Sequence, residues 1–204
     1  MTKYNIISLA HQKEFLLKGK PVAVLTGDEF LKKEGMTLTQ QVTVFYDSIE
    51  NRAISPVYGE VVLDKKGVDD DFAHGVGRIK AIAFAAVPDI IEKGIVILPL
   101  GKHKNDIKSL STMVAAPISI KGDEYIVVVV LRRNKFGDTR LYVHEVSLKQ
   151  KLLADSSNPT SMSATSQGVL SETLVGSSNP TSMSATSQGI VAKVLQKIIL
   201  AKSD

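Results

Sequence analysis

The spacing of apolar residues changes from a helical to a strand period along the chain, and these changes predict its elements. In the first third, the expected elements are a strand at residues 22–25, a turn into a brief helix that Gly35 ends, a helix over residues 39–51 and a strand at residues 58–63. Residues 1–67 are therefore predicted to form a small α/β subregion of the protein.

A further helix is expected after a run of three acidic residues. Asp69, Asp70 and Asp71 can cap and neutralise the positive start of a helix. The apolar body of that helix would be Ile79, Ile82, Ala83, Ala86 and Val87. Pro88 interrupts or restarts it, and Gly94 ends it. The same carboxylates could bind a metal, but consecutive carboxylates on a helix point in three directions, so capping is the preferred interpretation.

Strand candidates with short connections follow this helix, at residues 95–98, 111–120, 125–133 and 140–148. A tight turn at Gly122 and a loop at residues 134–139 predict an antiparallel meander of the last three. Residues 126–130 are apolar throughout, which indicates a central strand covered on both faces. One expected cover is the helix at residues 76–93, and the other is the N-terminal subregion or a C-terminal helix. We predict an α+β fold in which helices precede a four-stranded antiparallel sheet at residues 68–150.

The C-terminal part of the chain contains an internal repeat. The segment SSNPTSMSATSQG at residues 156–168 returns unchanged at residues 177–189. Its Ser, Thr, Asn-Pro and Gly content predicts poorly ordered or loop segments. Apolar residues at helical spacing follow the second copy and predict an amphipathic helix that anchors the tail at residues 151–204. Two copies are too few for a solenoid, so a duplicated tail is the simplest interpretation.

Composition excludes several classes of protein. The chain has 204 residues and no cysteine, so a disulfide framework, a thiolate nucleophile and a Cys-ligated metal site are ruled out. No apolar run is long enough to span a membrane, and no signal peptide is recognisable. We therefore expect a cytoplasmic protein without a membrane partner, a cofactor or a metal. A net charge of +4 without a dense basic run permits an anionic partner but does not require one.

The last predicted strand carries the strongest candidate chemistry. If Leu141 and Val143 face the core, alternation puts Tyr142 and His144 together on the opposite face. Only one of Arg132 and Arg133, on the neighbouring strand, can share that face. An imidazole, a phenol and a guanidinium on adjacent strands form a candidate surface for anion binding and proton transfer. The alternative is that these are ordinary polar residues of a sheet.

Two weaker candidates lie in loops. His74 and Arg78 stand in the segment DDDFAHGVGRIKA, which lacks the preceding strand and the third glycine of a dinucleotide-binding loop. Arg78 could still bind a phosphate near a helix start. Lys104 belongs to the polar segment GKHKNDIK, for which a solvated loop and a flexible contact to a nucleic-acid backbone are both open.

Several segments together resemble a known family. They are PVAVLTGDEF, the helix segment with His-Gly and Pro-Asp-Ile, MVAAPISIKGDEYIVVVVLRRN and RLYVHEV, within residues 20–149. They resemble the phage large polyvalent protein-associated domains and the C-terminal domains of MuF-type phage head proteins. The resemblance implies similarity to toxin-like nucleases of the barnase, EndoU, colicin and RelE type, built as helices followed by a four-stranded antiparallel sheet.

This resemblance implies a metal-independent ribonuclease that attacks RNA through the ribose 2′-hydroxyl. The site residues that it implies are His74, Arg78, Ser111, Thr112, Arg132, Arg133, Tyr142 and His144. The expected partners are RNA and an immunity or phage protein, in the cytoplasm of the host cell. The loop GKHKNDIKSLS lacks the tryptophan that relatives carry. The alternative function is therefore a non-catalytic structural or interaction module of a phage.

Overall fold

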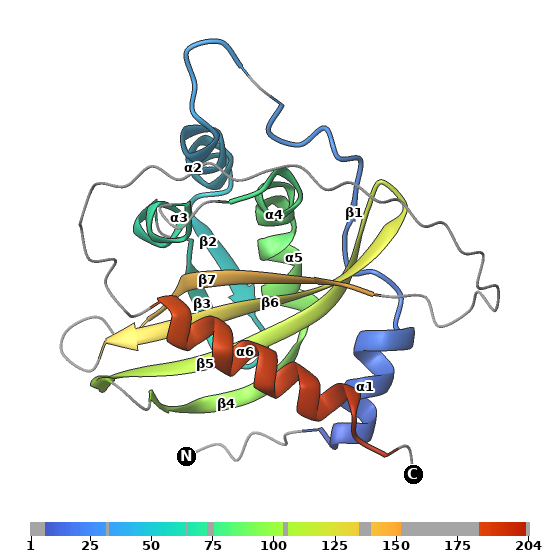
Figure 1. The fold of residues 1–204 in the computed structure, drawn as a ribbon. Coiled ribbons are helices and arrows are strands. Elements are labelled where there is room, and N and C mark those ends of the chain that lie inside the picture. The colour runs from blue at the N-terminus through green and yellow to red at the C-terminus, as the bar shows by residue number, and fades with distance from the viewer. Residues whose placement is uncertain are drawn as a thin grey trace, which may run out of the picture.

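We analysed a computed structural model of the chain, which describes residues 7–31, 33–63, 65–72, 76–103, 106–134, 140–151 and 184–202. Within these ranges the chain forms a mixed sheet flanked by helices on both faces (Figure 1). No helix of the described ranges is long and apolar enough to cross a lipid bilayer.

Seven strands of the described residues form one sheet. They are β1 (Val24–Leu25), β2 (Arg52–Ser55), β3 (Gly59–Val62), β4 (Ile95–His103), β5 (Asp106–Ile120), β6 (Asp123–Asn134) and β7 (Leu141–Gln150). The order is β1-β5-β6-β7-β3-β2, and β4 pairs with β5 on the same side as β1. Strand β1 is parallel to β5 and β3 is parallel to β7, whereas the other pairs are antiparallel.

The β5–β6 hairpin has the shortest connection in this part of the sheet. Ile120 pairs with Asp123, and the two residues between them have positive φ, 55° at Lys121 and 88° at Gly122. A two-residue turn with both φ angles positive matches the right-handed twist of the strands that it joins. The turn therefore fixes the register of two long, mainly apolar strands.

The helices are α1 (Leu9–Lys18), α2 (Leu38–Ser48), α3 (Lys65–Phe72), α4 (Arg78–Ala83), α5 (Val87–Lys93) and α6 (Ser184–Ile199), with a 3₁₀ turn at Phe84–Ala86. Local signals explain several of their ends. Thr37 and Gln40 form a capping box at the start of α2. Pro88 lies in the first turn of α5, and Gly94 follows the last residue of that helix.

The sheet separates two apolar cores. The larger core contains one face of β5–β7, the β2–β3 hairpin and helices α2 to α5, with Tyr46, Phe84 and Ile90 fully buried. The smaller core contains the other face and helices α1 and α6, through Leu16, Val191, Leu195 and Ile198. Figure 1 shows α6 (red) lying along this second face, next to α1. We call it the α6 face; the C-terminal helix is therefore the second cover of the central strand.

The sheet is larger and more mixed than the predicted four-stranded antiparallel sheet. Strands from the first third of the chain add to both sides, and two of the pairings are parallel. The expected helix between Asp28 and Gly35 is wrong, because the described residues there form turns. The acidic run is also not a cap: Asp71 lies inside α3, and Gly77 precedes α4 without a capping side chain.

The repeat lies mostly outside the described residues. Its first copy, at residues 156–168, falls entirely outside them, so the predicted loop there stays a prediction. Residues 184–189, which end the second copy, belong to α6 and not to a loop. The predicted apolar stripe after them is present, since Val191, Leu195 and Ile198 are buried against the sheet.

Candidate functional site

Three of the predicted site residues lie side by side across the middle of the sheet. Arg132 on β6 pairs with Ser111 on β5 and with Tyr142 on β7. Residues that pair directly across neighbouring strands point to the same face of a sheet. Their face is the α6 face, because Val130, two residues before Arg132, belongs to the smaller core. We call Ser111, Arg132 and Tyr142 the polar row.

A β-bulge interrupts β7 directly after the polar row. Leu131 pairs with Val143 and Val130 pairs with Glu145, so the pairing register skips His144, which is the extra residue of the bulge. A bulge of this kind shifts the side-chain alternation of one strand relative to its neighbour. Leu141 and Val143 face the larger core as predicted, and beyond the bulge Val146 faces that core too. Alternation alone therefore does not set the direction of His144, which is half-buried.

The same bulge places Glu145 on the α6 face, where it pairs with Val130, and not on the face of the larger core. Glu145 is 7% exposed, and its Oε1 accepts a hydrogen bond of 3.1 Å from the Ser147 hydroxyl. Burial is the largest influence on this carboxyl group and raises its pKa. The nearby Asp71 carboxylate raises the pKa further, whereas the Ser147 hydrogen bond and the charges of Lys80 and Arg132 lower it.

Arg132 is the cation of this arrangement on the α6 face. Its guanidinium interacts electrostatically with Glu145, two strand positions from the polar row. Its Nε is buried and has no hydrogen-bond partner within the described part of the chain. A buried guanidinium N–H normally finds an acceptor, so this unpaired donor is an exception within the described part of the chain.

A buried ion pair holds the outer edge of β7 at the bulge. Asp71 of α3 accepts a hydrogen bond of 2.6 Å from Lys80 Nζ and one of 2.9 Å from the backbone N–H of Val146. The Asp71 side chain is 4% exposed. Helix α3 can approach β7 because Gly67 lacks a side chain: a Cβ there would lie 2.0 Å from the Val143 carbonyl oxygen. Strand β3 does not pair with this part of β7, and the Val146 N–H finds its acceptor in the Asp71 carboxylate instead.

Two predicted residues point away from the polar row. Thr112 is fully buried, pairs with Leu131 and therefore faces the larger core. Its hydroxyl donates to the Leu98 carbonyl at 2.7 Å, so the 2.9 Å contact with Tyr58 is a bond that Thr112 accepts. Arg133 pairs with Leu110 and lies on the opposite face from Arg132. Of the predicted residues on β5 and β6, Arg132 and Ser111 share a face with Tyr142.

Arg78 has a structural contact elsewhere. Its guanidinium donates hydrogen bonds to the carbonyl oxygens of Gly27, Glu29 and Phe30. These bonds hold the turn after β1 against α4, and they use the donors that a phosphate would need. His74 and Lys104 lie outside the described residues, so their proposed roles stay predictions.

Sequence reasoning missed the acidic partners of the site. Asp71 was predicted to belong to a helix cap, and regular alternation along β7 would put Glu145 on the core face with Leu141 and Val143. The run of three aspartates did contain a signal, because consecutive side chains of a helix point in different directions and one of the three can face the core. Asp69 and Asp70 are exposed and Asp71 is buried. Among the described residues, no three His, Asp or Glu side chains gather as a metal site, and the absence of a metal stays a prediction.

Comparison with known proteins places the chain in a family. The family model for large polyvalent protein-associated domain 3 matches residues 35–142, more than half of the chain. The chain belongs to this family. The large polyvalent protein-associated domain spans α2 to the start of β7 and includes the polar row, Asp71 and Lys80. His144, Glu145 and α6 follow the matched residues. No curated protein and no solved structure gives a significant match to the chain.

The membership confirms the predicted kinship with phage-associated polyvalent protein domains. The resemblance had placed the family between residues 20 and 149, and the matched residues fall inside those limits. The match crosses residue 67 and includes β3, which pairs with β7.

Burial of Glu145 predicts a pH-dependent stability for this large polyvalent protein-associated domain. The raised pKa means that the folded state favours the protonated carboxyl, so its stabilising effect is present below the ordinary value of 4.5 and is lost as pH rises through the folded-state pKa. We expect Glu145→Gln and wild-type protein to unfold at similar urea concentrations near about pH 4, and the variant to become the more stable one by about pH 7. Urea titrations across this range measure the difference.

The exposed Glu92 on α5 offers a matched control for this titration. Glu92→Gln removes the same charge from the surface, and its stability should follow the wild-type curve at every pH. A Glu145→Gln curve that also runs parallel to wild type would contradict the effect of burial on Glu145.

Proposed function

We propose that this domain is a metal-independent ribonuclease-like domain, which cleaves RNA by attack of a ribose 2′-hydroxyl on the adjacent phosphorus. The observation that carries the proposal is the register that brings Ser111, Arg132 and Tyr142 side by side. His144 follows two residues after Tyr142 on β7. A hydroxyl, a guanidinium, a phenol and an imidazole are the groups that this reaction uses.

In the proposed reaction, a base removes the proton of the 2′-hydroxyl while its oxygen bonds to phosphorus. The bond from phosphorus to the 5′-oxygen breaks, and an acid gives that oxygen a proton. The products are a 2′,3′-cyclic phosphate and a 5′-hydroxyl end. We assign the proton transfers to His144 and Tyr142, which lie two residues apart on β7. His74 remains a second candidate for one of these transfers.

Arg132 is the proposed phosphate ligand of this site. A guanidinium can donate two parallel hydrogen bonds to the oxygens of a phosphate and stabilise the charge that grows on them. The unpartnered Nε supports this role for Arg132. Arg133 lies on the other face, so it does not share the role, and Ser111 is the hydroxyl donor in place of Thr112.

The test is an RNA cleavage assay in the presence of EDTA. We expect purified protein to convert total RNA into fragments with 2′,3′-cyclic phosphate ends, because the proposed chemistry uses side chains of the chain alone. End-group analysis of the fragments distinguishes this route from hydrolysis that leaves 3′-hydroxyl ends. Intact RNA after incubation with folded protein would contradict the proposal.

A non-catalytic interaction module is the second candidate function. The observation that favours it is the coverage of the α6 face, on which α6 buries Val191, Leu195 and Ile198 against the sheet. In that case, Arg132 and Glu145 form a structural charge pair of the sheet. Intact RNA in the assay above, together with stable binding of a phage protein, would favour this module.

A further inference from the structure

The two helices that cover the α6 face carry the whole positive excess of the chain. Residues 7–20, around α1, and residues 190–202, in and after α6, contain six lysines and one acidic residue, Glu14. Since the whole chain has 25 basic and 21 acidic residues, its remaining residues carry no net positive charge. Neither segment contains a dense basic run, so the fold brings these cations together from opposite ends of the sequence.

Helices α1 and α6 lie side by side on one face of the sheet (Figure 1). Lys13 of α1 joins them, because its Nζ donates a hydrogen bond of 2.7 Å to the carbonyl oxygen of Ala201, after the end of α6. The apolar side chains of both helices face the sheet. Their exposed residues therefore point away from the sheet, on the same side of the molecule.

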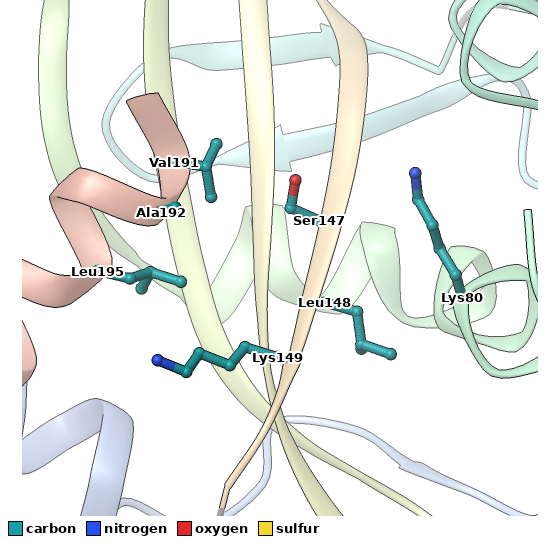
Figure 2. A pocket seen from close by; sticks show the side chains of 7 residues that line it. All are labelled: Lys80, Ser147, Leu148, Lys149, Val191, Ala192 and Leu195. Carbon is teal, nitrogen blue, oxygen red and sulfur yellow. The ribbon is translucent and has the colours of Figure 1, made fainter. Parts of the chain in front are cut away.

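Six exposed lysines belong to these helices, to their C-terminal flanks and to the end of β7. We call them the lysine surface: Lys18, Lys20, Lys149, Lys193, Lys197 and Lys202. Figure 2 shows the Lys149 side chain on β7 extending towards α6. Within the described part of the chain, none of the six forms an ion pair, whereas Lys80, Lys93 and Lys151 each pair with a carboxylate. No neighbouring carboxylate therefore neutralises the lysine surface.

We propose that the lysine surface binds the phosphate backbone of RNA, a choice of ligand that rests on the proposed ribonuclease function. Lysine ammonium groups neutralise phosphates and release the counterions of the nucleic acid, which gives binding without sequence preference. A protein partner fits this surface less well, because lysine is depleted at protein interfaces, whose centres are apolar.

An anionic lipid bilayer also fits the lysine surface less well than RNA. A helix that lies in a membrane interface inserts a continuous apolar side between the headgroups. Val191 and Leu195, which make up that side of α6, are buried against the sheet instead. The large apolar side chains that these segments do expose, Ile7, Leu9 and Leu200, lie around the start of α1 and after the end of α6, and they form no stripe along either helix.

Fluorescence anisotropy with a labelled 2′-O-methyl RNA of about 12 nucleotides measures binding to the full chain. This probe lacks the 2′-hydroxyl that the proposed cleavage needs, so it stays intact during the titration. If about four lysines contact phosphates, the dissociation constant should rise roughly fiftyfold between about 50 and about 200 mM salt. Absence of binding at the lower salt concentration would overturn the proposal, and so would binding that salt does not weaken.

Two pairs of substitutions locate the RNA. Lys193→Gln with Lys197→Gln removes two cations from α6 and should weaken binding about tenfold at low salt, with a shallower salt dependence. Glutamine has a helix propensity close to that of lysine, so α6 should persist. Lys33→Gln with Lys65→Gln removes the same charge from exposed positions before α2 and at the start of α3, and should leave the affinity within about twofold. Equal losses in the two double variants would overturn the lysine surface as the binding site.

The possible outcomes separate this surface from the proposed cleavage. Binding of the probe without cleavage of total RNA would support the lysine surface and contradict the ribonuclease. Cleavage without binding of the probe would overturn the lysine surface and support the ribonuclease. Lipid vesicles with about one quarter phosphatidylserine test the bilayer. Binding to these vesicles as tight as to RNA, and lost with Lys193 and Lys197, would overturn RNA as the ligand.

Discussion

Replacing Asp71 by alanine is expected to destabilise the protein by about 3 kcal/mol, which is more than a hundredfold in the unfolding equilibrium. The change leaves Lys80 without its partner at 2.6 Å and the Val146 N–H without its acceptor at 2.9 Å. Removing one member of a buried ion pair typically costs 3–5 kcal/mol, and Lys80, which is 21% exposed, can recover part of this cost in water. Urea denaturation monitored by circular dichroism measures the loss.

Asp70 provides the matched control, because it lies next to Asp71 in α3 and is exposed. Asp70→Ala should change the free energy of unfolding by no more than about 0.5 kcal/mol. Asp71→Asn keeps an acceptor for the Val146 N–H but loses the charge, so its stability should fall between wild type and Asp71→Ala. If Asp71→Ala is as stable as Asp70→Ala, the buried pair does not stabilise the fold.

Local pattern was enough to predict most long elements of the fold. The spacing of Val42, Phe45 and Ile49 predicted α2, and the continuous apolar run of β6 predicted a strand covered on both faces. Both signals depend on residues that are close in sequence. The glycine of the turn predicted the β5–β6 hairpin for the same reason, because Gly122 adopts a positive φ without steric cost.

The pairing of distant segments was not predictable in this way. Strand β1 has two residues and is parallel to the end of β5, and β3 is parallel to the start of β7. Short strands carry little pattern, and nothing in their sequence specifies a partner many residues away. The predicted sheet therefore contained four antiparallel strands and lacked the strands from the first third of the chain.

The candidate site was predicted as far as strand alternation held. Tyr142 and Arg132 share a face because no irregularity separates their pairing. The bulge at His144 then shifts the alternation, and it exchanges the faces expected for Glu145 and Val146. Two contacts from outside the strand lie at this bulge, the Asp71 carboxylate on the Val146 N–H and the close approach of Gly67 to Val143. The sequence of β7 by itself therefore does not predict the bulge.

These contacts connect the stability of the fold to the proposed chemistry. Asp71 binds the backbone two residues after His144, so it helps to fix the bulge that sets the place of His144 relative to Tyr142. Under the proposed function, Asp71→Asn should therefore lower RNA cleavage even where the protein remains folded.

Replacing His144 by alanine is expected to lower RNA cleavage roughly 10²- to 10⁴-fold, the usual loss when a positioned general acid or base is removed. His144 is half-buried and is the extra residue of the bulge, and alanine is compatible with the strand backbone there. The variant should therefore keep its far-UV circular dichroism spectrum. Initial rates of cleavage of a defined RNA in EDTA, at equal protein concentration, measure the effect.

His11 is the control for this experiment, because it is an exposed histidine on α1 outside the polar row. His11→Ala removes an imidazole from the surface and should cleave RNA at the wild-type rate. The comparison also excludes a contaminating ribonuclease, whose activity would be the same in both preparations. A folded His144→Ala protein that cleaves as fast as His11→Ala would remove His144 from the mechanism, and the proton transfers would then have to be sought at Tyr142 and His74.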